Sequence, residues 1–334
     1  MRISLRLRYR EPRELHELVT TAEAVGIHGV WISEPWGYDA APLLGWCAAH
    51  TSTIQLGTHI ASIFARTPAA TAGMAASLAS ISDGRFRLGL GTSGPAVVEG
   101  WHGVEFAKPI ARTRDTIAII RQVLSGSYVD YVGATASAPR ARSGRKPLRF
   151  AGSTSMKSVP IYLGALGPAN QRLTAQHADG WTPTPYSPDH HGAFASDLDA
   201  ALADNGRQVQ LAPVAPIAIG EDLRTMWDLE RRWSAFYLGA MGQFYARAAT
   251  RMGFGDMTSR VRRLWASGER TAAAAAVEDS YADAIGLFGP ASRIRERLDR
   301  YSAAGMDEVV LELRRPDLVD RLSDLRTIGA LIAA

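Results

Sequence analysis

Two glycine-containing segments of the chain could bind a ligand through bare backbone amides. Each follows a short apolar run, and in the later one a proline stands where a helix can begin. Exposed amides at the start of a helix favour an anion, so we expect a phosphate at the later segment and a polar ring edge at the earlier one; a tight strand-to-helix turn is the alternative for both. The earlier segment is Gly91, Thr92, Ser93 and Gly94, and the later one is Gly164, Ala165, Leu166, Gly167 and Pro168.

Further polar side chains follow other apolar runs. Glu34 comes directly after the run at residues 30–32, and Thr182 comes after Trp181. Glu34 could contact a ligand, or it could be a surface carboxylate or a helix cap. The histidines are scattered, and Cys47 is the only cysteine, so neither a metal site nor an intrachain disulfide is expected. A metal-dependent hydrolase is therefore disfavoured.

Short apolar strands that alternate with amphipathic helices must position these segments. Repeated strand–helix units at this spacing predict parallel strands, and eight of them predict a closed (β/α)₈ TIM barrel of the α/β class; an open doubly wound sheet is the alternative. In such a barrel the functional residues lie at the carboxyl ends of the strands. The strands are expected at residues 3–7, 30–32, 54–60, 86–91, 160–164, 180–182, 208–219 and 308–313.

Two segments interrupt this alternation within a single expected domain that spans residues 1–334. Residues 126–159 are rich in glycine, serine and basic residues and predict a hairpin and loop before the fifth strand. Residues 221–285 have a helical pattern after the seventh strand. We interpret the helical insertion as a lid or pocket wall; a dimerisation or packing appendage is the alternative.

The composition is that of an ordinary globular protein. Hydrophobic residues make up 46% of the 334 residues and charged residues 21%, and the net charge of +4 is small for this length. We therefore expect no nucleic-acid partner. No apolar run approaches the roughly 20 residues that a membrane helix needs, and the first ten residues lack the apolar block of a signal peptide. A cytoplasmic protein without a membrane partner is expected.

Five motifs, in their order and spacing, resemble the landmarks of the luciferase-like monooxygenase superfamily. More narrowly, they are similar to its branch that uses coenzyme F420, a deazaflavin. The resemblance extends from about residue 3 to residue 328. The motifs are GVWISE at 29–34, LGT at 56–58, DGRFRLGLG at 83–91, VEGWHG at 98–103 and ALGP at 165–168.

The resemblance implies a deazaflavin that lies across the barrel mouth. In the family the third strand ends in a bulge with a non-prolyl cis peptide behind the ring, and the matching positions here are Ala61, Ser62 and Ile63. Glu34 matches a residue that faces the pyrimidine edge of the cofactor. The loop from Gly164 to Gly167 matches the one that receives the phosphate, and Thr182, after Trp181, matches a position near that phosphate.

The resemblance also suggests which residues take part in catalysis. Glu99 and His102 fall where related enzymes place an acidic residue near the ring, so either is a candidate proton donor. Trp36 matches an aromatic residue that lines the substrate side in a sugar-phosphate dehydrogenase branch. That branch has a histidine where this chain has Pro35, and the departure argues against a sugar-phosphate substrate.

The expected function is therefore F420-dependent oxidoreduction, a reductase or dehydrogenase reaction. A hydride would move to or from a C=C, C=N or carbinol group of a small organic or secondary-metabolite substrate. The alternative is a luciferase-like monooxygenase that uses reduced FMN and oxygen, and a third possibility is a flavin-binding protein without turnover. The family commonly forms homodimers through the helices after strands two and three, here residues 43–49 and 68–81.

Overall fold

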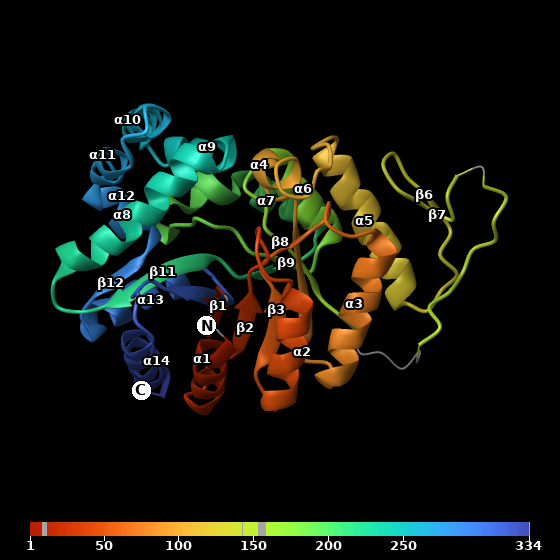
Figure 1. Ribbon diagram of the computed structural model, residues 1–334, viewed down its shortest axis with the longest axis horizontal. Coiled ribbons are helices and arrows are strands. Elements are labelled where there is room, and N and C mark those ends of the chain that lie inside the picture. Colours follow the sequence, from red (N-terminus) through yellow and green to blue (C-terminus); the bar gives the residue numbers. More distant parts are fainter. Residues whose placement is uncertain (9–11, 142, 153–157, 334) are drawn as a thin grey trace.

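Parallel strands form the centre of the molecule, and helices surround them (Figure 1). The computed structural model describes residues 1–8, 12–141, 143–152 and 158–333. Within that part of the chain, neighbouring strands of the main sheet follow the order β10-β9-β8-β5-β3-β2-β1-β13-β11-β12, and all of these pairs are parallel. The strands are β1 (Arg2–Leu7), β2 (Gly29–Ile32), β3 (Gln55–Thr58), β5 (Phe86–Gly91), β8 (Ile161–Leu163), β9 (Gly180–Trp181), β10 (Gln210–Leu211), β11 (Val214–Ile219), β12 (Leu287–Gly289) and β13 (Glu308–Leu313).

The sheet curls round because the run at 208–219 pairs with two different neighbours. This run was predicted as one strand, but it is divided at Pro213 into β10, which pairs with β9, and β11, which pairs with β13. The amide of Ala212 donates to the carbonyl of Trp181 at 2.9 Å, and the carbonyl of Pro213 accepts from the amide of Val310 at 2.9 Å. The structure is therefore a TIM-barrel-like α/β fold, as the alternation of strands and helices predicted.

Two short strands were not predicted. β4 (Ala61–Ser62) pairs with β5, and β12 pairs with β11. Both are two or three residues long, so their strand character depends on the neighbouring strand rather than on a periodic pattern of their own.

Helices α2, α3 and α8 each begin at a residue whose side chain caps the first turn. Asp39 accepts from the amide of Ala41 at the start of α2, and Thr67 accepts from the amide of Ala70 at the start of α3. No helix among the described residues combines the length and the apolar character needed to cross a membrane. The helices are α1 (Pro12–Ala24), α2 (Ala40–His50), α3 (Pro68–Ile81), α4 (Pro95–Val98), α5 (Pro109–Leu124), α6 (Pro168–His177), α7 (His191–Asn205), α8 (Leu223–Ala240), α9 (Gln243–Arg251), α10 (Gly255–Ala266), α11 (Arg270–Ala275), α12 (Asp279–Ile285), α13 (Ala291–Ala303) and α14 (Leu318–Ala333).

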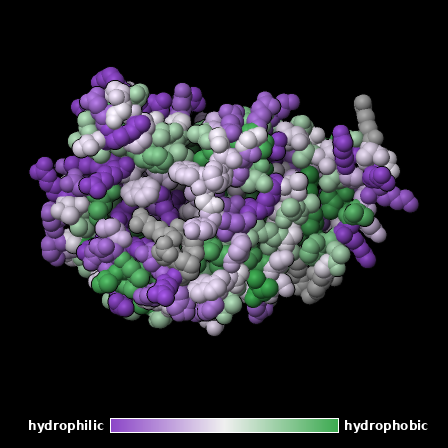
Figure 2. Space-filling view, in the orientation of Figure 1, coloured by the Kyte–Doolittle hydropathy of each residue, from purple (hydrophilic) through white to green (hydrophobic). Residues whose placement is uncertain are grey.

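The two segments that interrupt the alternation take different forms. Residues 221–285 form α8 to α12, which lie together on one side of the molecule (Figure 1). Within residues 126–159, β6 (Tyr131–Val132) and β7 (Ser137–Ala138) form an antiparallel hairpin away from the body. Asp115 of α5 connects this hairpin to the helix, because its carboxylate accepts hydrogen bonds from the hydroxyl of Tyr131 at 2.9 Å and from the amide of Thr135 at 2.7 Å. The face in Figure 2 mixes hydrophilic and hydrophobic residues, with hydrophobic ones near this end.

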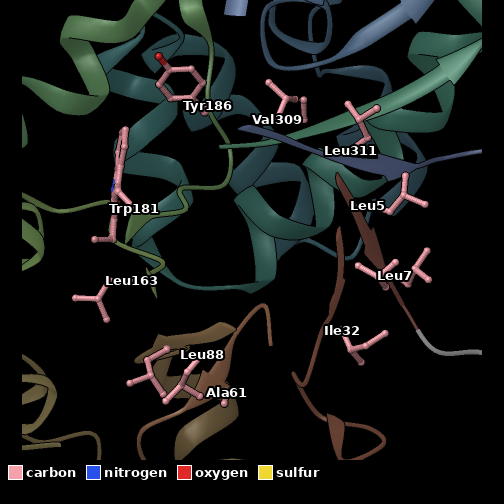
Figure 3. Packing of buried hydrophobic residues seen from close by; sticks show 14 of the residues in the cluster. Leu5, Leu7, Ile32, Ala61, Leu88, Leu163, Trp181, Tyr186, Val309 and Leu311 are labelled. Carbon is pink, nitrogen blue, oxygen red and sulfur yellow. The ribbon is translucent and has the colours of Figure 1, made fainter. Parts of the chain in front are cut away.

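The core lies between the strands and the helices that cover them. Figure 3 shows Leu5, Ile32, Leu88 and Leu311, which come from different strands and belong to one buried cluster. Trp181 belongs to this core and is fully buried, and its ring nitrogen donates to the carbonyl of Ala165 at 2.8 Å. The carboxyl ends of the strands are thereby held on a rigid frame.

Candidate functional site

A cavity of about 310 Å³ opens where the carboxyl ends of the strands meet, and it is large enough for an organic ligand. The loops after β2, β3, β5, β8 and β9 contribute to it, and α8 and α9 close one side. The structure thus brings together most of the residues that the sequence singled out. Those that line the cavity are Glu34, Trp36, Gly91, Thr92, Ser93, Gly164, Leu166, Gly167 and Thr182.

The loop after β8 presents an uncapped helix start to the cavity. Gly167 is the N-cap of α6, with extended backbone (φ −98°, ψ 155°) and no side chain that bonds to the first turn. The first amides of a helix have no acceptor within the helix, and those of Ala169 and Asn170 belong to residues that line the cavity. The side-chain oxygen of Asn170 is buried and has no hydrogen-bond partner among the described residues. The amides suit an anionic group, whereas the oxygen of Asn170 suits a hydrogen-bond donor such as a ligand hydroxyl.

Arg251 of α9 holds this loop in place from outside the cavity. Its guanidinium donates to the carbonyl of Leu166 at 2.8 Å and to the carbonyl of Ala193 at 2.9 Å. The guanidinium occupies a carbonyl of this loop, while the start of α6 remains without a side-chain cap. α9 therefore contributes to the geometry of this loop.

Glu34 lines the cavity and also has a structural role. Its carboxylate accepts from Arg66 at 2.6 Å and from the amide of Ala40, the first residue of α2, at 3.2 Å. Arg66 also pairs with Asp39 at 2.6 Å. Both interpretations of Glu34 from the sequence, ligand contact and helix cap, are compatible with this position.

His59 forms part of the cavity floor and is neutral. Its Nε2 lies 2.9 Å from the hydroxyl of Thr182, and its Nδ1 lies 3.4 Å from a guanidinium nitrogen of Arg6. Burial, and secondly the positive charge of Arg6, lower the pKa of His59 to about 3. An uncharged imidazole at neutral pH can bind a polar ligand atom without adding charge to the floor.

This lowered pKa predicts a pH-dependent stability. Between about pH 3 and pH 6.5, His59 is protonated in the unfolded chain but not in the folded chain, because its pKa is 6.5 when unfolded and about 3 when folded. As the pH is lowered through this window, the free energy of unfolding should therefore fall by about 1.4 kcal/mol per pH unit on account of His59 alone. Urea unfolding at several pH values should show a shallower decline for His59→Gln than for the wild type. Equal slopes for the two proteins would contradict the assignment.

Two arginines that the sequence analysis did not single out also line the cavity. Arg6 and Arg8 lie at the end of β1, and both form ion pairs with Glu312, the one to Arg8 at 2.6 Å. The sequence contained the information needed to place Arg6, because it alternates with Leu5 and Leu7 along the strand. Since Leu5 and Leu7 face the surrounding helices, the side chain of Arg6 faces the barrel interior. Tyr237 of α8 and Tyr245 of α9 complete this inner end of the cavity.

Five residues predicted to bind the cofactor do not line the cavity. The cis peptide that the resemblance placed at residues 61–63 joins His59 and Ile60 instead, and Ile60 lines the cavity. The residues after it turn into β4 and the core, because β4 pairs with β5. The residues that are buried away from the cavity are Ala61, Ser62, Ile63, Ala165 and Trp181.

The two candidate proton donors, Glu99 and His102, also lie outside the cavity lining. The short helix α4 begins at Pro95, and Val97 is the part of it that lines the cavity. The residues that follow turn away, and the carboxylate of Glu99 accepts from the amide of Phe106 at 3.1 Å within its own loop. Glu99 therefore anchors a loop in this structure.

Comparison with known proteins gives a consistent picture. A family model described as luciferase-like monooxygenase matches residues 2–308. A Mycobacterium tuberculosis protein named as a coenzyme F420-dependent oxidoreductase is 34% identical over 349 residues, which cover 97% of this chain and 99% of that protein. The 5,10-methylenetetrahydromethanopterin reductase of Archaeoglobus fulgidus is 28% identical, with 89% of this chain and 88% of that protein covered.

Solved structures share the fold over almost the whole chain. The coenzyme F420-dependent tetrahydromethanopterin reductase of Methanopyrus kandleri superimposes with a TM-score of 0.83 over 98% of both chains, at 21% identity. The family match confirms the resemblance that the five motifs suggested. The chain belongs to the luciferase-like monooxygenase family.

Proposed function

We propose that this protein is a coenzyme F420-dependent oxidoreductase, a reductase or dehydrogenase. The 34% identical relative, which matches over nearly its full length, is named for this cofactor, and so is the reductase with the same fold. The observation in the structure that carries the proposal is the cavity itself, in which an uncapped helix start faces a barrel mouth.

The residues present fit a phosphorylated deazaflavin. The bare amides beside Gly167 offer donors to a phosphate, and the buried, unpartnered oxygen of Asn170 offers an acceptor to a hydroxyl of the ligand; no described protein group uses either. A Cβ atom on Gly91 would lie 2.9 Å from Ile60, and one on Gly164 would lie 3.3 Å from it, so the glycines keep this wall flat. Gly164 to Asn170 would hold the phosphate, and Ile60, Gly91 and Ser93 would lie against the ring.

When bound, the deazaflavin supplies or accepts a hydride, and the chain provides the rest of the chemistry. Glu34, held by Arg66, is an acceptor for N–H groups at a ring edge. The neutral His59 and the hydroxyl of Thr182 form a polar floor without net charge. The mouth is lined by Trp36 and other apolar side chains, which exclude water from the place where a hydride moves.

The assembly belongs to the same proposal. We propose one domain over the whole chain and a cytoplasmic enzyme that acts on a small organic molecule. The proposed homodimer forms through α2 and α3, which contact each other side by side on the surface (Figure 1). Ile81 at the end of α3 is 58% exposed and would be covered in such a dimer.

Titration with both candidate cofactors tests the function and separates it from the FMN-dependent alternative. The expected result is micromolar or tighter binding of F420, followed by absorbance changes of the deazaflavin when a carbonyl or carbinol substrate is added. Preferential binding of FMN, with consumption of oxygen, would favour a monooxygenase. Failure of F420 to bind at micromolar concentrations would overturn the proposal.

A further inference from the structure

The hydroxyl of Tyr237 is the best-placed proton donor in the cavity. Its oxygen accepts a hydrogen bond from Arg8 at 2.9 Å, and it has no other hydrogen-bond partner among the described residues. The proton of this hydroxyl is therefore available to a ligand. Glu99 and His102, which the sequence suggested for this role, do not line the cavity, whereas Tyr237 does.

Arg8 is fixed in a way that suits a neighbouring proton donor. Its Nε pairs with Glu312 at 2.6 Å, and its guanidinium carbon lies 4.0 Å above the ring of Trp233. Arg314 and Arg6 pair with the same glutamate, and Arg314 also pairs with Glu230, so this buried cluster holds one more positive than negative charge. A phenolate, or a substrate oxygen that gains negative charge, is stabilised beside such a cluster.

A second tyrosine stands next to the first. The ring of Tyr245 packs edge-to-face on that of Tyr237, with 4.7 Å between the centroids, and it lines the cavity as well. Burial raises the pKa of Tyr245, so its hydroxyl stays protonated. The inner end of the cavity is thus built from neutral hydroxyl donors backed by cations, a donor set that polarises an oxygen atom.

Another part of the cavity lining is apolar. Trp36, Ile110 and Phe244 line it with 41%, 37% and 36% of their surfaces exposed, which are large values for side chains of this kind. The charged side chains of the described cavity lining are Arg6, Arg8 and Glu34, and each is paired with a protein group. A phosphate or carboxylate in the mouth would therefore have no charged partner there.

We propose that the substrate is an uncharged compound with an apolar body and one carbonyl oxygen (or, in the reverse direction, one hydroxyl), and that Tyr237 is its proton donor. The inference rests on the proposed function, whose reduced deazaflavin supplies two electrons as hydride. In reduction, a C–H bond forms at the carbonyl carbon, and the π-electron pair of C=O moves to oxygen. That oxygen takes the proton of Tyr237, and the phenolate beside Arg8 takes a proton from water.

Binding can be measured without cofactor, which separates this inference from the proposed function. Calorimetric titration of the chain alone with methyl alkyl ketones should show affinity that rises about threefold per added methylene group up to methyl hexyl ketone. Octanoate, which has a similar length and a carboxylate head, should bind about tenfold more weakly when inorganic phosphate occupies the anion site beside Gly167, because the apolar lining cannot hydrate the charge. Tighter binding of octanoate, or no binding of the ketones, would overturn the proposal even if F420 binds.

Variants of a tryptophan then test the apolar part of the cavity lining. Trp36→Ala should lower ketone affinity about tenfold, since it removes a large apolar contact. Trp101→Ala is the matched control, because Trp101 is 60% exposed and does not line the cavity. Neither change should alter F420 binding. Equal ketone affinity in the two variants would remove Trp36 from the proposed site.

Tyr237→Phe tests the proton donor. With one hydroxyl removed, single-turnover hydride transfer to the ketone should slow about 100-fold, while the dissociation constants for ketone and F420 stay within about twofold. Tyr128→Phe, at an exposed position before β6, is the control and should leave the rate unchanged. An unchanged rate in Tyr237→Phe would overturn the assignment, and a loss confined to Tyr245→Phe would move the proton to the neighbouring hydroxyl.

Discussion

Replacing Gly167 with aspartate is expected to weaken F420 binding about 100-fold and to leave the fold as stable as before. Gly167 is the N-cap of α6, and its extended backbone is the conformation that an aspartate cap adopts. The new carboxylate would accept from the first amides of the helix and add negative charge where the phosphate is proposed to lie. A like-charge contact worth about 3 kcal/mol corresponds to the stated factor.

Gly167→Ala is the matched control for this prediction. A Cβ atom at this position meets nothing within 4 Å, and the φ of −98° suits any residue. Alanine should therefore leave F420 affinity within about threefold of the wild type. Titration of both variants with F420, together with their melting temperatures, gives the answer. If the aspartate variant binds F420 as well as the alanine variant does, the phosphate lies elsewhere.

The substitutions of residues that line the cavity test two different functions, cofactor binding and substrate binding. The substitution at Gly167 acts on the cradle for the anion, whereas those at Trp36 and Tyr237 act on the proposed substrate end. The cradle belongs to the barrel loops and α6, while Tyr237 belongs to the helical insertion after β11. We therefore expect cofactor affinity and substrate choice to vary independently, with α8 and α9 determining the substrate. The insertion then serves as a pocket wall, one of its two interpretations from the sequence.

The sequence predicted the elements of this fold well because long periodic runs determine them. β1, β5 and β13 each appear as an apolar run, and the helices between them have clear starts. The short strands β4 and β12 could not be predicted, since pairing with a neighbour defines them. Proline alone does not predict the division of 208–219 at Pro213, because Pro216 stands inside β11 without interrupting it.

The predicted site residues that line the cavity stand where glycines mark a loop, and those outside the lining follow a change in the direction of a loop. Gly91, Gly164 and Gly167 line the cavity because bare backbone has a recognisable sequence. Glu99 was misplaced because the direction of the chain after α4 depends on packing that spacing does not encode. Tyr237 lies more than 200 residues from Arg8, its hydrogen-bond partner, so only the folded chain brings them together.

The second large effect concerns the barrel interior below the cavity. Glu308 of β13 receives two hydrogen bonds from Arg87 of β5, at 2.6 and 3.2 Å, and one from the ring nitrogen of Trp31 at 3.2 Å. Arg87 also lies 4.3 Å from the centroid of the Trp31 ring. A Cβ atom on Gly29 would lie 2.3 Å from the guanidinium, so the glycine makes room for it. This pair joins opposite sides of the sheet inside the barrel.

Glu308→Ala should lower the free energy of unfolding by about 3 to 5 kcal/mol, because it leaves the buried charge of Arg87 without a partner. Glu296→Ala, at an exposed position on α13, should change it by less than about 0.5 kcal/mol. Burial alone would raise the pKa of Glu308, but Arg87 and the hydrogen bonds outweigh it and hold the pKa below its ordinary value of 4.5. The stabilisation is therefore complete above that pH and is lost as the pH falls below it. Urea unfolding at neutral pH measures the difference, and a double variant, Arg87→Met with Glu308→Leu, should recover most of the loss. A single variant that loses less than about 1 kcal/mol would show that water or a rearranged side chain compensates Arg87.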